Sequence, residues 1–492
     1  MSEQKTKVVI AGGGTAGWLA AAALSQQLGS AVEVTLVESA EIGTVGVGEA
    51  TIPPMKTFHR LLRIDEQEFM RTTHATFKLG IQFENWRVEG EKYFHSFGTT
   101  GRDTLVSEFI HFWLRGREMG IAKDFGDYCV EFKAALENKC STQGDTKVNH
   151  AFHLDAGLYA QYLRTFAERH GATQVEGNIA EVLQDNNSGY ITGLRMASGD
   201  IVSGDLFVDC TGFRGLLIEQ TLHAGYESWE HWLPCNRAVA VQTASVRDPV
   251  PYTRSIAHHA GWRWQIPLQH RVGNGTVFCN RYMSEDEATA KLLADIQGDV
   301  ITEPRVIQFQ TGRRRKNWVK NCVAMGLSSG FLEPLESTSI HLIMTSIMRL
   351  LQLFPGKDIQ QATIDEYNTQ AAIEFELIRD FIILHYKATE REDSKFWRYC
   401  KRMDIPESLA HRIDLFRETG KSYQKEGELF RLDSWTQVML GQGIYPKRYH
   451  PMVDSMQTQE LERFLQATAA NVAAVVDSMP PHEQFLAEYC AI

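Results

Sequence analysis

Near its N-terminus the 492-residue chain reads Lys7-Val-Val-Ile-Ala-Gly-Gly-Gly-Thr-Ala-Gly17. The apolar run from Val8 to Ala11 is typical of a buried parallel strand. Gly12, Gly14 and Gly17 follow with the G-x-G-x-x-G spacing. In that pattern the first glycine makes a tight turn, the second lets the backbone approach a pyrophosphate, and the third lets a helix pack closely on the strand. The segment therefore predicts a dinucleotide-binding turn.

The residues after this turn agree with it. Trp18–Leu28 is rich in Ala and Leu and predicts the helix whose first N–H groups face the pyrophosphate. A second expected strand, Val32–Val37, ends at Glu38, about 20 residues beyond the glycines, where an acid that binds a ribose belongs. A lone glycine pattern can be a mere turn. Here strand, glycines, helix, strand and acid agree, which favours a Rossmann-like α/β fold.

The charge balance limits the classes of partner. A net charge of −11 argues against general binding to nucleic acid or to an anionic membrane surface. The dense basic run Arg313–Lys316 is interpreted as a salt-bridged or solvated strand end rather than a nucleic-acid patch. The sequence has no run of about 18 uninterrupted apolar residues, which a membrane span requires. We therefore expect no nucleic-acid partner and no membrane partner.

The cysteines and histidines give no metal-binding pattern. The eight cysteines are scattered without C-x-x-C or zinc-like pairing, which predicts reduced thiols in a cytoplasmic protein. His153, His258 and His259 have no partners at metal-ligand spacing, so we expect no metal site. The segment Met1–Lys7 is short and polar, and we expect no leader before the first strand.

Two expected strands carry unusual side chains. Phe77–Phe83 is strand-like and places Lys78 between apolar neighbours. Lysines are seldom buried without a reason, although a surface lysine with a buried stem is the commoner case. In Tyr93–Gly98, His95 and Phe97 share one face of a strand, as ordinary core or as an aromatic wall.

The segment Val323–Ile340 combines small residues with acids. A strand is expected to end at Gly326, and a loop that carries Glu336 then leads into a helix. The free N–H groups of that helix's first turn are a ready anion site. Alternatively, the hydroxyls of Ser337–Ser339 simply cap the helix. Both interpretations stay open at this point.

The rest of the chain adds one aromatic motif and several expected elements. In Gly261–Pro267, Trp262 and Trp264 point to one face of a strand, as a rigid wall or as packing between sheets. No second glycine cluster lies between a strand and a helix, so no nicotinamide site is expected. Further expectations are helices at 58–73, 158–170, 363–389, 406–419 and 458–478, strands at 174–184, 191–196 and 205–212, and a loop-rich segment at 433–450.

Taken together, these segments resemble the flavin-dependent tryptophan halogenase family over nearly the whole chain. The marks are the glycine turn, Lys78, Gly46-Val-Gly-Glu-Ala-Thr-Ile-Pro53, Trp262-x-Trp264-x-Ile266-Pro267 and Glu333-Pro-Leu-Glu-Ser-Thr338. The resemblance implies an α/β fold with a mixed sheet. Residues 1–355 are expected to form a Rossmann-like FAD-binding module of the flavin monooxygenase/halogenase type, and residues 356–492 a mainly helical cap that completes the substrate pocket.

The resemblance also implies a reaction. FADH2, O2 and chloride or bromide give hypohalous acid, which halogenates an electron-rich, indole-like aromatic. A separate NAD(P)H-dependent flavin reductase is implied as a partner, in agreement with the missing nicotinamide site. Lys78 is implied to hold the hypohalous acid as a haloamine or by hydrogen bonding, because a desolvated amine is neutral part of the time and nucleophilic. Glu336 is implied to polarise the halogenating species or to take the proton from the arene.

Binding residues follow from the same resemblance. The backbone N–H groups of Thr338 and Ser339 match a halide site, and His95 and Phe97 match residues that sandwich an indole ring. The positions that match contacts to FAD are Gly12, Gly14, Thr15, Ala16, Gly17, Glu38, Ala50, Ile179, Leu327 and Ile340.

Two departures from the family pattern affect specificity. Ser339 stands where the family usually has Gly, so a side chain crowds the halide site. Ser434-Trp435 stands where tryptophan-specific members carry paired tyrosines that anchor the amino-acid backbone. We therefore expect an indole-like or larger aromatic substrate rather than free tryptophan.

Two other functions stay open. A single-component flavin hydroxylase predicts NAD(P)H oxidation without an added reductase and a product that gains oxygen. A flavin-binding regulatory or carrier protein predicts that Lys78 and Glu336 substitutions change nothing measurable. A homodimer is an option by analogy with large members of the fold alone.

Overall fold

The computed structural model describes residues 5–39, 48–105, 107–356 and 358–491. They form two compact units, each drawn from three chain segments. Unit 1 comprises Met1–Ala75, Leu154–Glu230 and Phe309–Glu376, and unit 2 comprises Thr76–His153, His231–Gln308 and Leu377–Ile492. The expected domain boundary after residue 355 stays a prediction. Gly46 and Val47 of the family motif lie outside the described residues.

Unit 1 is built on a six-stranded sheet with the order β20-β21-β12-β1-β2-β8. Its central strand, β1 (Thr6–Ala11), pairs in parallel with β2 (Val32–Glu38) and with β12 (Leu206–Asp209). β20 (Trp318–Val319) pairs antiparallel with β21 (Cys322–Ala324), which confirms a mixed sheet. The continuous apolar run of β1 is buried on both faces, as a central parallel strand requires. At the far edge, β8 (Thr173–Glu176) pairs in parallel with β2.

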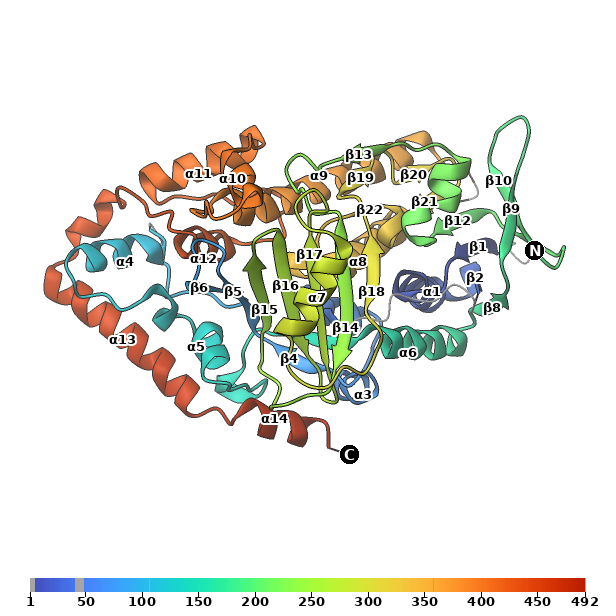
Figure 1. The fold of residues 1–492 in the computed structure, drawn as a ribbon. Helices are drawn as coiled ribbons and strands as arrows, with labels where there is room; N and C mark the ends of the chain where they lie inside the picture. The colour runs from blue at the N-terminus through green and yellow to red at the C-terminus, as the bar shows by residue number, and fades with distance from the viewer. Residues whose placement is uncertain (1–4, 40–47, 106, 357, 492) are drawn as a thin grey trace. The chain divides into compact units, whose positions relative to one another are not determined.

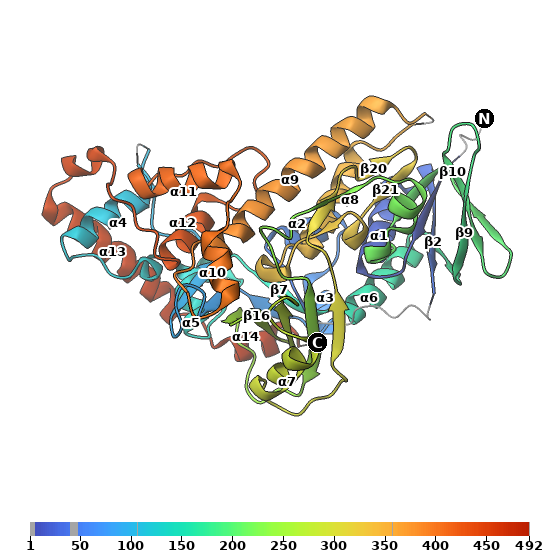
Figure 2. The same cartoon turned by 45° about the horizontal axis from the view of Figure 1, so that its top comes forward.

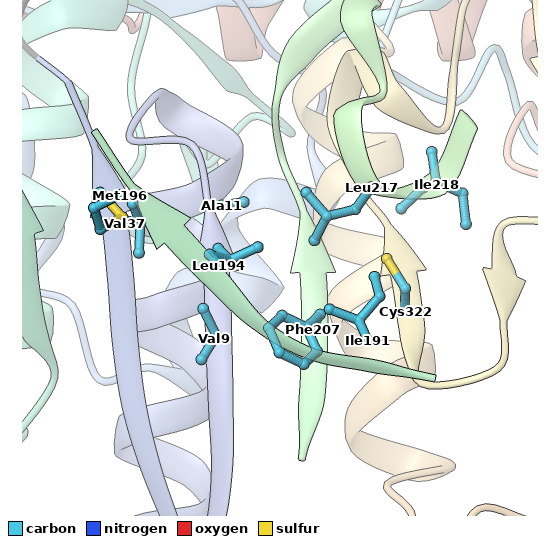
Figure 3. Close-up of a cluster of buried hydrophobic side chains, with 11 residues drawn as sticks. Val9, Ala11, Val37, Ile191, Leu194, Met196, Phe207, Leu217, Ile218 and Cys322 are labelled. Carbon is cyan, nitrogen blue, oxygen red and sulfur yellow. The ribbon is translucent and has the colours of Figure 1, made fainter. Parts of the chain in front are cut away.

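Both faces of this sheet are covered. On one face α1 (Thr15–Leu28) packs beside α6 (Ala156–Arg169), as Figures 1 and 2 show. On the other lies an antiparallel sheet of β9 (Ile179–Gln184), β10 (Ile191–Met196) and β11 (Ile201–Ser203). Figure 3 shows the apolar cluster between the two sheets, which contains Val9, Ala11, Val37, Ile191, Leu194, Met196, Phe207, Leu217, Ile218 and Cys322. Further elements of unit 1 are β3 (Gly48–Ala50), α2 (Pro54–Leu61), α3 (Glu66–Thr72), β13 (Tyr226–Ser228), β19 (Gly312–Arg314), β22 (Gly330–Phe331) and α8 (Ser339–Gln352).

Unit 2 contains a seven-stranded sheet with the order β18-β14-β17-β16-β15-β5-β6. Its neighbours are antiparallel except for the parallel pair β15 and β5. Figure 1 shows α7 (Glu285–Asp295) lying along the sheet, where it contacts β14 and β17. The strands are β5 (Gly80–Glu84), β6 (Lys92–Ser96), β14 (Arg237–Thr243), β15 (Thr253–His258), β16 (Gly261–Pro267), β17 (Val272–Phe278) and β18 (Arg305–Gln308).

Helices dominate the C-terminal part of the chain. α9 (Gln361–Lys387) has residues in both units. The other helices of unit 2 are α4 (Phe109–Glu118), α5 (Val130–Leu136), α10 (Lys395–Arg402), α11 (Glu407–Thr419), α12 (Leu432–Gly441), α13 (Thr458–Asp477) and α14 (His482–Tyr489). The helices expected at 158–170, 363–389, 406–419 and 458–478 are confirmed to within a few residues. Each helix in the described part of the chain is too short or too polar to cross a bilayer.

Four expectations were wrong. Residues 174–184 form two strands of different sheets, β8 and β9, with a turn between them at Gly177, which has φ +145°. Residues 58–73 form two helices rather than one, separated by a turn in which Arg63 has φ +54°. Residues 77–83 form two strands: β4 (Thr76–Lys78) pairs with β7 (Ala151–Asp155), whereas β5 joins the large sheet. Residues 433–450 contain α12 rather than only loops. Its buried Trp435, Val438 and Met439 follow helical spacing, which the nearby glycines obscured.

Candidate active site

The three motif glycines have separate steric roles. Gly12 has φ +112°, and a Cβ there would overlap the carbonyl oxygen of Cys210. A Cβ on Gly17 would overlap the carbonyl oxygen of Gly12. Gly14, by contrast, has no atom within 4 Å of a built Cβ. The first and third glycines are therefore needed for packing, while the second leaves open space beside the backbone.

The start of α1 and the end of β2 frame that open space. Gly14 is the N-cap of α1, supplies no side-chain cap, and is followed by no acid in the first turn. Such a helix end attracts an anion. Glu38, at the end of β2, accepts hydrogen bonds from Gln174 Nε2 (2.7 Å) and Trp18 Nε1 (3.3 Å), and a Cβ on Gly13 would overlap its carboxylate. Burial raises the pKa of Glu38 above its usual value. A pyrophosphate beside the helix end and a ribose beside this carboxylate fit the turn.

Other positions expected to contact FAD approach the same turn. A Cβ on Gly326 would lie 2.8 Å from Ala16 Cβ, so the turn that carries Leu327 lies against the start of α1. The N–H of Gly177 donates to the carbonyl oxygen of Glu38 (2.8 Å), which brings the chain entering Ile179 to the same edge of the sheet. Two further expected positions are buried in unit 1, Ala50 on β3 and Ile340 in the first turn of α8.

The start of α8 has the features of an anion site rather than of a capped helix. Thr338 is its N-cap, but the Thr338 side chain makes no capping hydrogen bond. Its fully buried hydroxyl has no hydrogen-bond partner among the described residues. Ser337 just before it has φ +60°, a strained conformation for a residue other than glycine. The Thr338 hydroxyl therefore does not cap this helix, and the N–H groups of its first turn, such as that of Ser339, suit an anion.

Glu336 belongs to the same short segment. It lies two residues before the N-cap of α8, in a 3-10 turn at Pro334–Glu336, and its side chain has no exposed surface. Acids are rarely buried completely unless partners or chemistry require it. The local fold therefore places a buried carboxylic acid next to the helix end that favours an anion.

Lys78 is buried in unit 2. The side chain lies on β4 with no exposed surface, which excludes the surface interpretation. Its Nζ lies 5.2 Å from the centroid of the Phe97 ring, within the range of a cation–π contact. Phe97 follows β6, and its N–H donates to the carbonyl oxygen of Leu79 (2.9 Å). The strand split at Leu79 thus brings the amine and the ring together.

His95 and Phe97 form a corner rather than two parallel walls. Their ring centroids are 6.4 Å apart and the rings are nearly perpendicular, at 80°. His95 is the last residue but one of β6 and is buried, whereas Phe97 lies just past the strand and keeps part of its surface exposed. Behind His95, Phe381 and Phe430 stack on each other with centroids 3.8 Å apart. Phe97 is therefore the ring with surface left for a ligand.

Two groups in unit 2 had no sequence signal. His153 hydrogen-bonds through its two ring nitrogens to the hydroxyls of Thr76 (3.0 Å) and Thr253 (2.9 Å). Burial first, and then the charges of Lys78 and His482, hold the pKa of His153 well below its usual value. A neutral imidazole therefore supports the strand that carries Lys78. The second group is α12, whose side chains reach the loop after β6.

The remaining motifs are structural. Trp262 and Trp264 have ring centroids 6.1 Å apart, and Trp262 also faces Trp86, so this motif packs in the core of unit 2. Arg313 pairs with Glu227 and Glu376, and Arg314 pairs with Glu219, which confirms a salt-bridged strand end. None of the eight cysteines, all of which lie within the described residues, forms a disulfide. The described residues contain no group of three or more side chains suited to hold a metal ion.

A family model described as "Tryptophan halogenase" matches residues 7–458. The chain belongs to the tryptophan halogenase family. Xcc4156, a flavin-dependent halogenase from Xanthomonas campestris, has a solved structure with a TM-score of 0.97 and 54% identity, covering 99% of this chain and 98% of that one. BrvH, a flavin-dependent halogenase from Brevundimonas sp. BAL3, gives a TM-score of 0.95 and 44% identity, covering 99% of this chain and all of that one.

A curated relative extends the comparison. Tryptophan 7-halogenase RebH from Lentzea aerocolonigenes is 34% identical over 527 residues, which is 99% of both chains. The family, the α/β halogenase fold and the enzyme class predicted from the sequence are therefore confirmed. Membership in this flavin-dependent family makes a flavin the cofactor, and the glycine turn with its uncapped helix fits that group.

Proposed function

We propose that this halogenase uses FADH2, O2 and chloride or bromide to halogenate an electron-rich, indole-like aromatic rather than free tryptophan. The observation that carries the proposal is the fully buried Lys78 amine, 5.2 Å from the centre of the partly exposed Phe97 ring. When bound, the reduced flavin supplies, with O2, the two-electron oxidation of halide to hypohalous acid. The residues that would hold it are Gly12, Gly14, Thr15, Ala16, Gly17, Glu38, Ala50, Ile179, Leu327 and Ile340.

The halide is assigned to the start of α8. The N–H groups of Thr338 and Ser339 belong to a helix end without a side-chain cap or an acid in its first turn, which suits an anion. The side chain of Ser339 adds bulk next to that position. We expect it to influence the preference between chloride and bromide.

Lys78 is assigned to carry the oxidised halogen. Its neutral amine reacts with hypohalous acid to form an N–halogen bond and release water, or it holds the acid by a hydrogen bond. The neutral amine is the form that reacts, because only that form has a free electron pair. The ring carbon of the substrate then takes the halogen, and Glu336 accepts the proton that this carbon loses.

The proposed substrate class rests on Trp435, which is one of the two residues that stand where tryptophan-specific members of the family carry paired tyrosines. Trp435 of α12 is buried, and its Nε1 donates to Glu428 Oε1 at 3.0 Å. The Arg412 guanidinium lies over the Trp435 ring, 4.0 Å from its centroid. The Trp435, Glu428 and Arg412 side chains carry no hydroxyl group for an amino-acid backbone. Phe97 keeps part of its ring surface exposed beside the buried His95, so a ring without an amino-acid group suits the site.

The partners are proposed on the same basis. FADH2 has to come from a separate NAD(P)H-dependent flavin reductase, because the chain has one dinucleotide fingerprint. No nucleic acid and no membrane are proposed as partners. The homodimer and the cytoplasmic location stay predictions.

The test is a mass spectrum of indole incubated with FAD, NADH, a separate flavin reductase and either bromide or chloride. We expect a bromine or chlorine isotope doublet with the wild type. For Lys78→Met, which keeps the side-chain length but removes the amine, we expect at least about a hundredfold less product with unchanged flavin binding.

Three results would contradict this proposal. A product that gains oxygen would indicate a hydroxylase. Equal halogenation by Lys78→Met and the wild type would remove Lys78 from the reaction. Flavin binding without any turnover of aromatic substrates would favour a carrier or regulatory protein.

A further inference from the structure

The side chain of Gln437 forms hydrogen bonds with residues on both sides of Phe97 in the chain. Figure 1 shows α12 next to β6, and the two elements are in contact. Gln437 Oε1 accepts from the N–H (2.7 Å) and the hydroxyl (3.1 Å) of Ser96. Its Nε2 donates to Thr100 Oγ1 (3.2 Å) and to the carbonyl oxygen of Gly98 (3.5 Å). One buried carboxamide therefore holds the backbone before and after Phe97.

Other groups fix the remaining backbone of this loop. The N–H of Phe97 donates to the carbonyl oxygen of Leu79, and Asn149 Nδ2 donates to the carbonyl oxygen of Phe97, both at 2.9 Å. Asp433, also on α12, accepts from the N–H of Thr100 at 2.9 Å. The loop is thus held from three directions, and α12 supplies two of its anchors.

The loop has no room to move inward. A Cβ on Gly98 would lie 2.7 Å from Cys129 Sγ and would overlap the Glu131 carboxylate. Loss of the Gln437 contacts would leave the N–H of Ser96 buried without an acceptor, which is costly. The alternative is that the loop moves outward and carries the Phe97 ring with it.

We propose that Gln437 is a positioning residue that fixes the Phe97 ring over the Lys78 amine, so that the aromatic substrate meets the halogen carried there. This inference rests on the proposed function. Its physical reason is that aromatic contacts depend on the position of the ring, so a displaced Phe97 ring holds the aromatic substrate less tightly beside the amine. A substrate that is held loosely reacts less often before hypohalous acid escapes to solvent.

The chain offers a matched control in Gln442, at the C-terminal end of the same helix. Gln442 is also buried, and its Nε2 donates to Tyr93 Oη and to the carbonyl oxygen of His385, each at 3.0 Å. Gln437→Met removes four hydrogen bonds and Gln442→Met removes two, because Gln442 Oε1 has no partner among the described residues, and only Gln437 holds the Phe97 loop. Indole is the probe, and the readouts are kcat, KM and halogenated product per FADH2 oxidised.

For Gln437→Met we expect the KM for indole to rise about tenfold and the product per FADH2 to fall about twofold or more, with kcat within about twofold. Hypohalous acid trapped in solution by a thiol reagent should rise correspondingly. Gln442→Met should lose less thermal stability than Gln437→Met and keep the wild-type KM and product yield. Equal KM and yield for Gln437→Met and wild type, or equal defects in both variants, would overturn the inference.

The two proposals fail in different ways. A wild type that halogenates no aromatic contradicts the proposed function. A wild type that halogenates indole while Gln437→Met behaves identically contradicts only the role of Gln437. A crystal structure of Gln437→Met tests the placement without activity: we expect the Phe97 ring to be displaced or disordered, and an unmoved ring would refute the assignment.

Discussion

The glycine turn of unit 1 and the aromatic site of unit 2 are assembled in opposite ways. The turn belongs to Thr6–Glu38, a contiguous βαβ segment in which we expect the backbone to do most of the flavin binding. The aromatic site draws Lys78, Phe97 and Gln437 from distant parts of the chain and depends on their side chains. We therefore expect substitutions that add atoms next to the backbone of the turn to weaken flavin binding. Substrate binding should instead weaken when a single long-range hydrogen bond is removed.

Among the substitutions that test this difference, Gly17→Ala should have the largest effect on stability and on FAD binding. The new Cβ would overlap the carbonyl oxygen of Gly12, and backbone atoms cannot move aside cheaply. We expect a loss of about 3 kcal/mol of unfolding free energy, at the upper end for overpacking, and about a hundredfold weaker FAD binding. Denaturant unfolding and flavin fluorescence titration measure the two quantities.

Gly14→Ala is the matched control for that variant. A Cβ at Gly14 meets no atom within 4 Å, and Gly14 has an ordinary negative φ of −76°. The flavin-free stability should therefore stay within about 0.5 kcal/mol of wild type, while FAD binding weakens because the new methyl group faces the pyrophosphate. Equal loss of stability in both alanine variants would show that Gly14 and Gly17 do not differ in their steric roles.

Each unit contains a buried histidine that should make the stability of the protein sensitive to acid. Burial lowers the pKa of His59 in unit 1 to about 4 and that of His482 in unit 2 to about 4, from an ordinary value near 6.5. Unfolding lets each imidazole take up a proton below its ordinary pKa. The stability is therefore fully present above pH 6.5 and falls as the pH drops toward 4, by about 2 to 3 kcal/mol for each group.

Replacing either buried histidine with glutamine, which does not titrate, tests this pH dependence of stability. His59→Gln and His482→Gln should each flatten the dependence of the unfolding free energy on pH between 6.5 and 4, even if each lowers stability at pH 7. His411→Gln, at an exposed position, serves as the control and should leave the curve unchanged. A curve for His59→Gln as steep as that of the wild type would mean that this histidine is protonated in the folded protein.

The same contrast explains what the sequence alone could predict. Gly12, Gly14, Gly17 and Glu38 lie close together in the chain, so strand, turn and helix signals identified the βαβ unit, and its role in flavin binding stays a prediction. Lys78 was recognisable only as an unusual lysine between apolar residues, until the family resemblance gave it a role. Local patterns carry this information because the contacts themselves are local.

The rest depended on contacts between residues far apart in the sequence. Ser96 and Gln437 are separated by 341 positions, and neither residue type signals the other. The break between β4 and β5 at Leu79 arises because the two strands pair with different partners, which periodicity does not encode. The missing cap at Thr338 was equally invisible, because a threonine at this position suggests capping, whereas its side chain makes no capping hydrogen bond.

The smallest effects are expected for the substitution of one tryptophan in each unit. Trp435→Phe removes the indole N–H that donates to Glu428, and Trp318→Phe in unit 1 removes the one that donates to the carbonyl oxygen of Lys320 (2.9 Å). Both rings are buried, so each variant should lose about 1 to 2 kcal/mol of unfolding free energy.

Their effects on catalysis should differ. Trp435 contacts Phe381 edge-on at 4.8 Å between centroids, and Phe381 in turn contacts His95 of the aromatic corner. We therefore expect Trp435→Phe to raise the KM for indole about threefold through a looser His95, whereas Trp318→Phe leaves that KM unchanged. Steady-state kinetics at matched flavin saturation measures both. If Trp318→Phe raised the KM as much as Trp435→Phe, the substrate site would depend on overall stability rather than on the ring contacts behind His95.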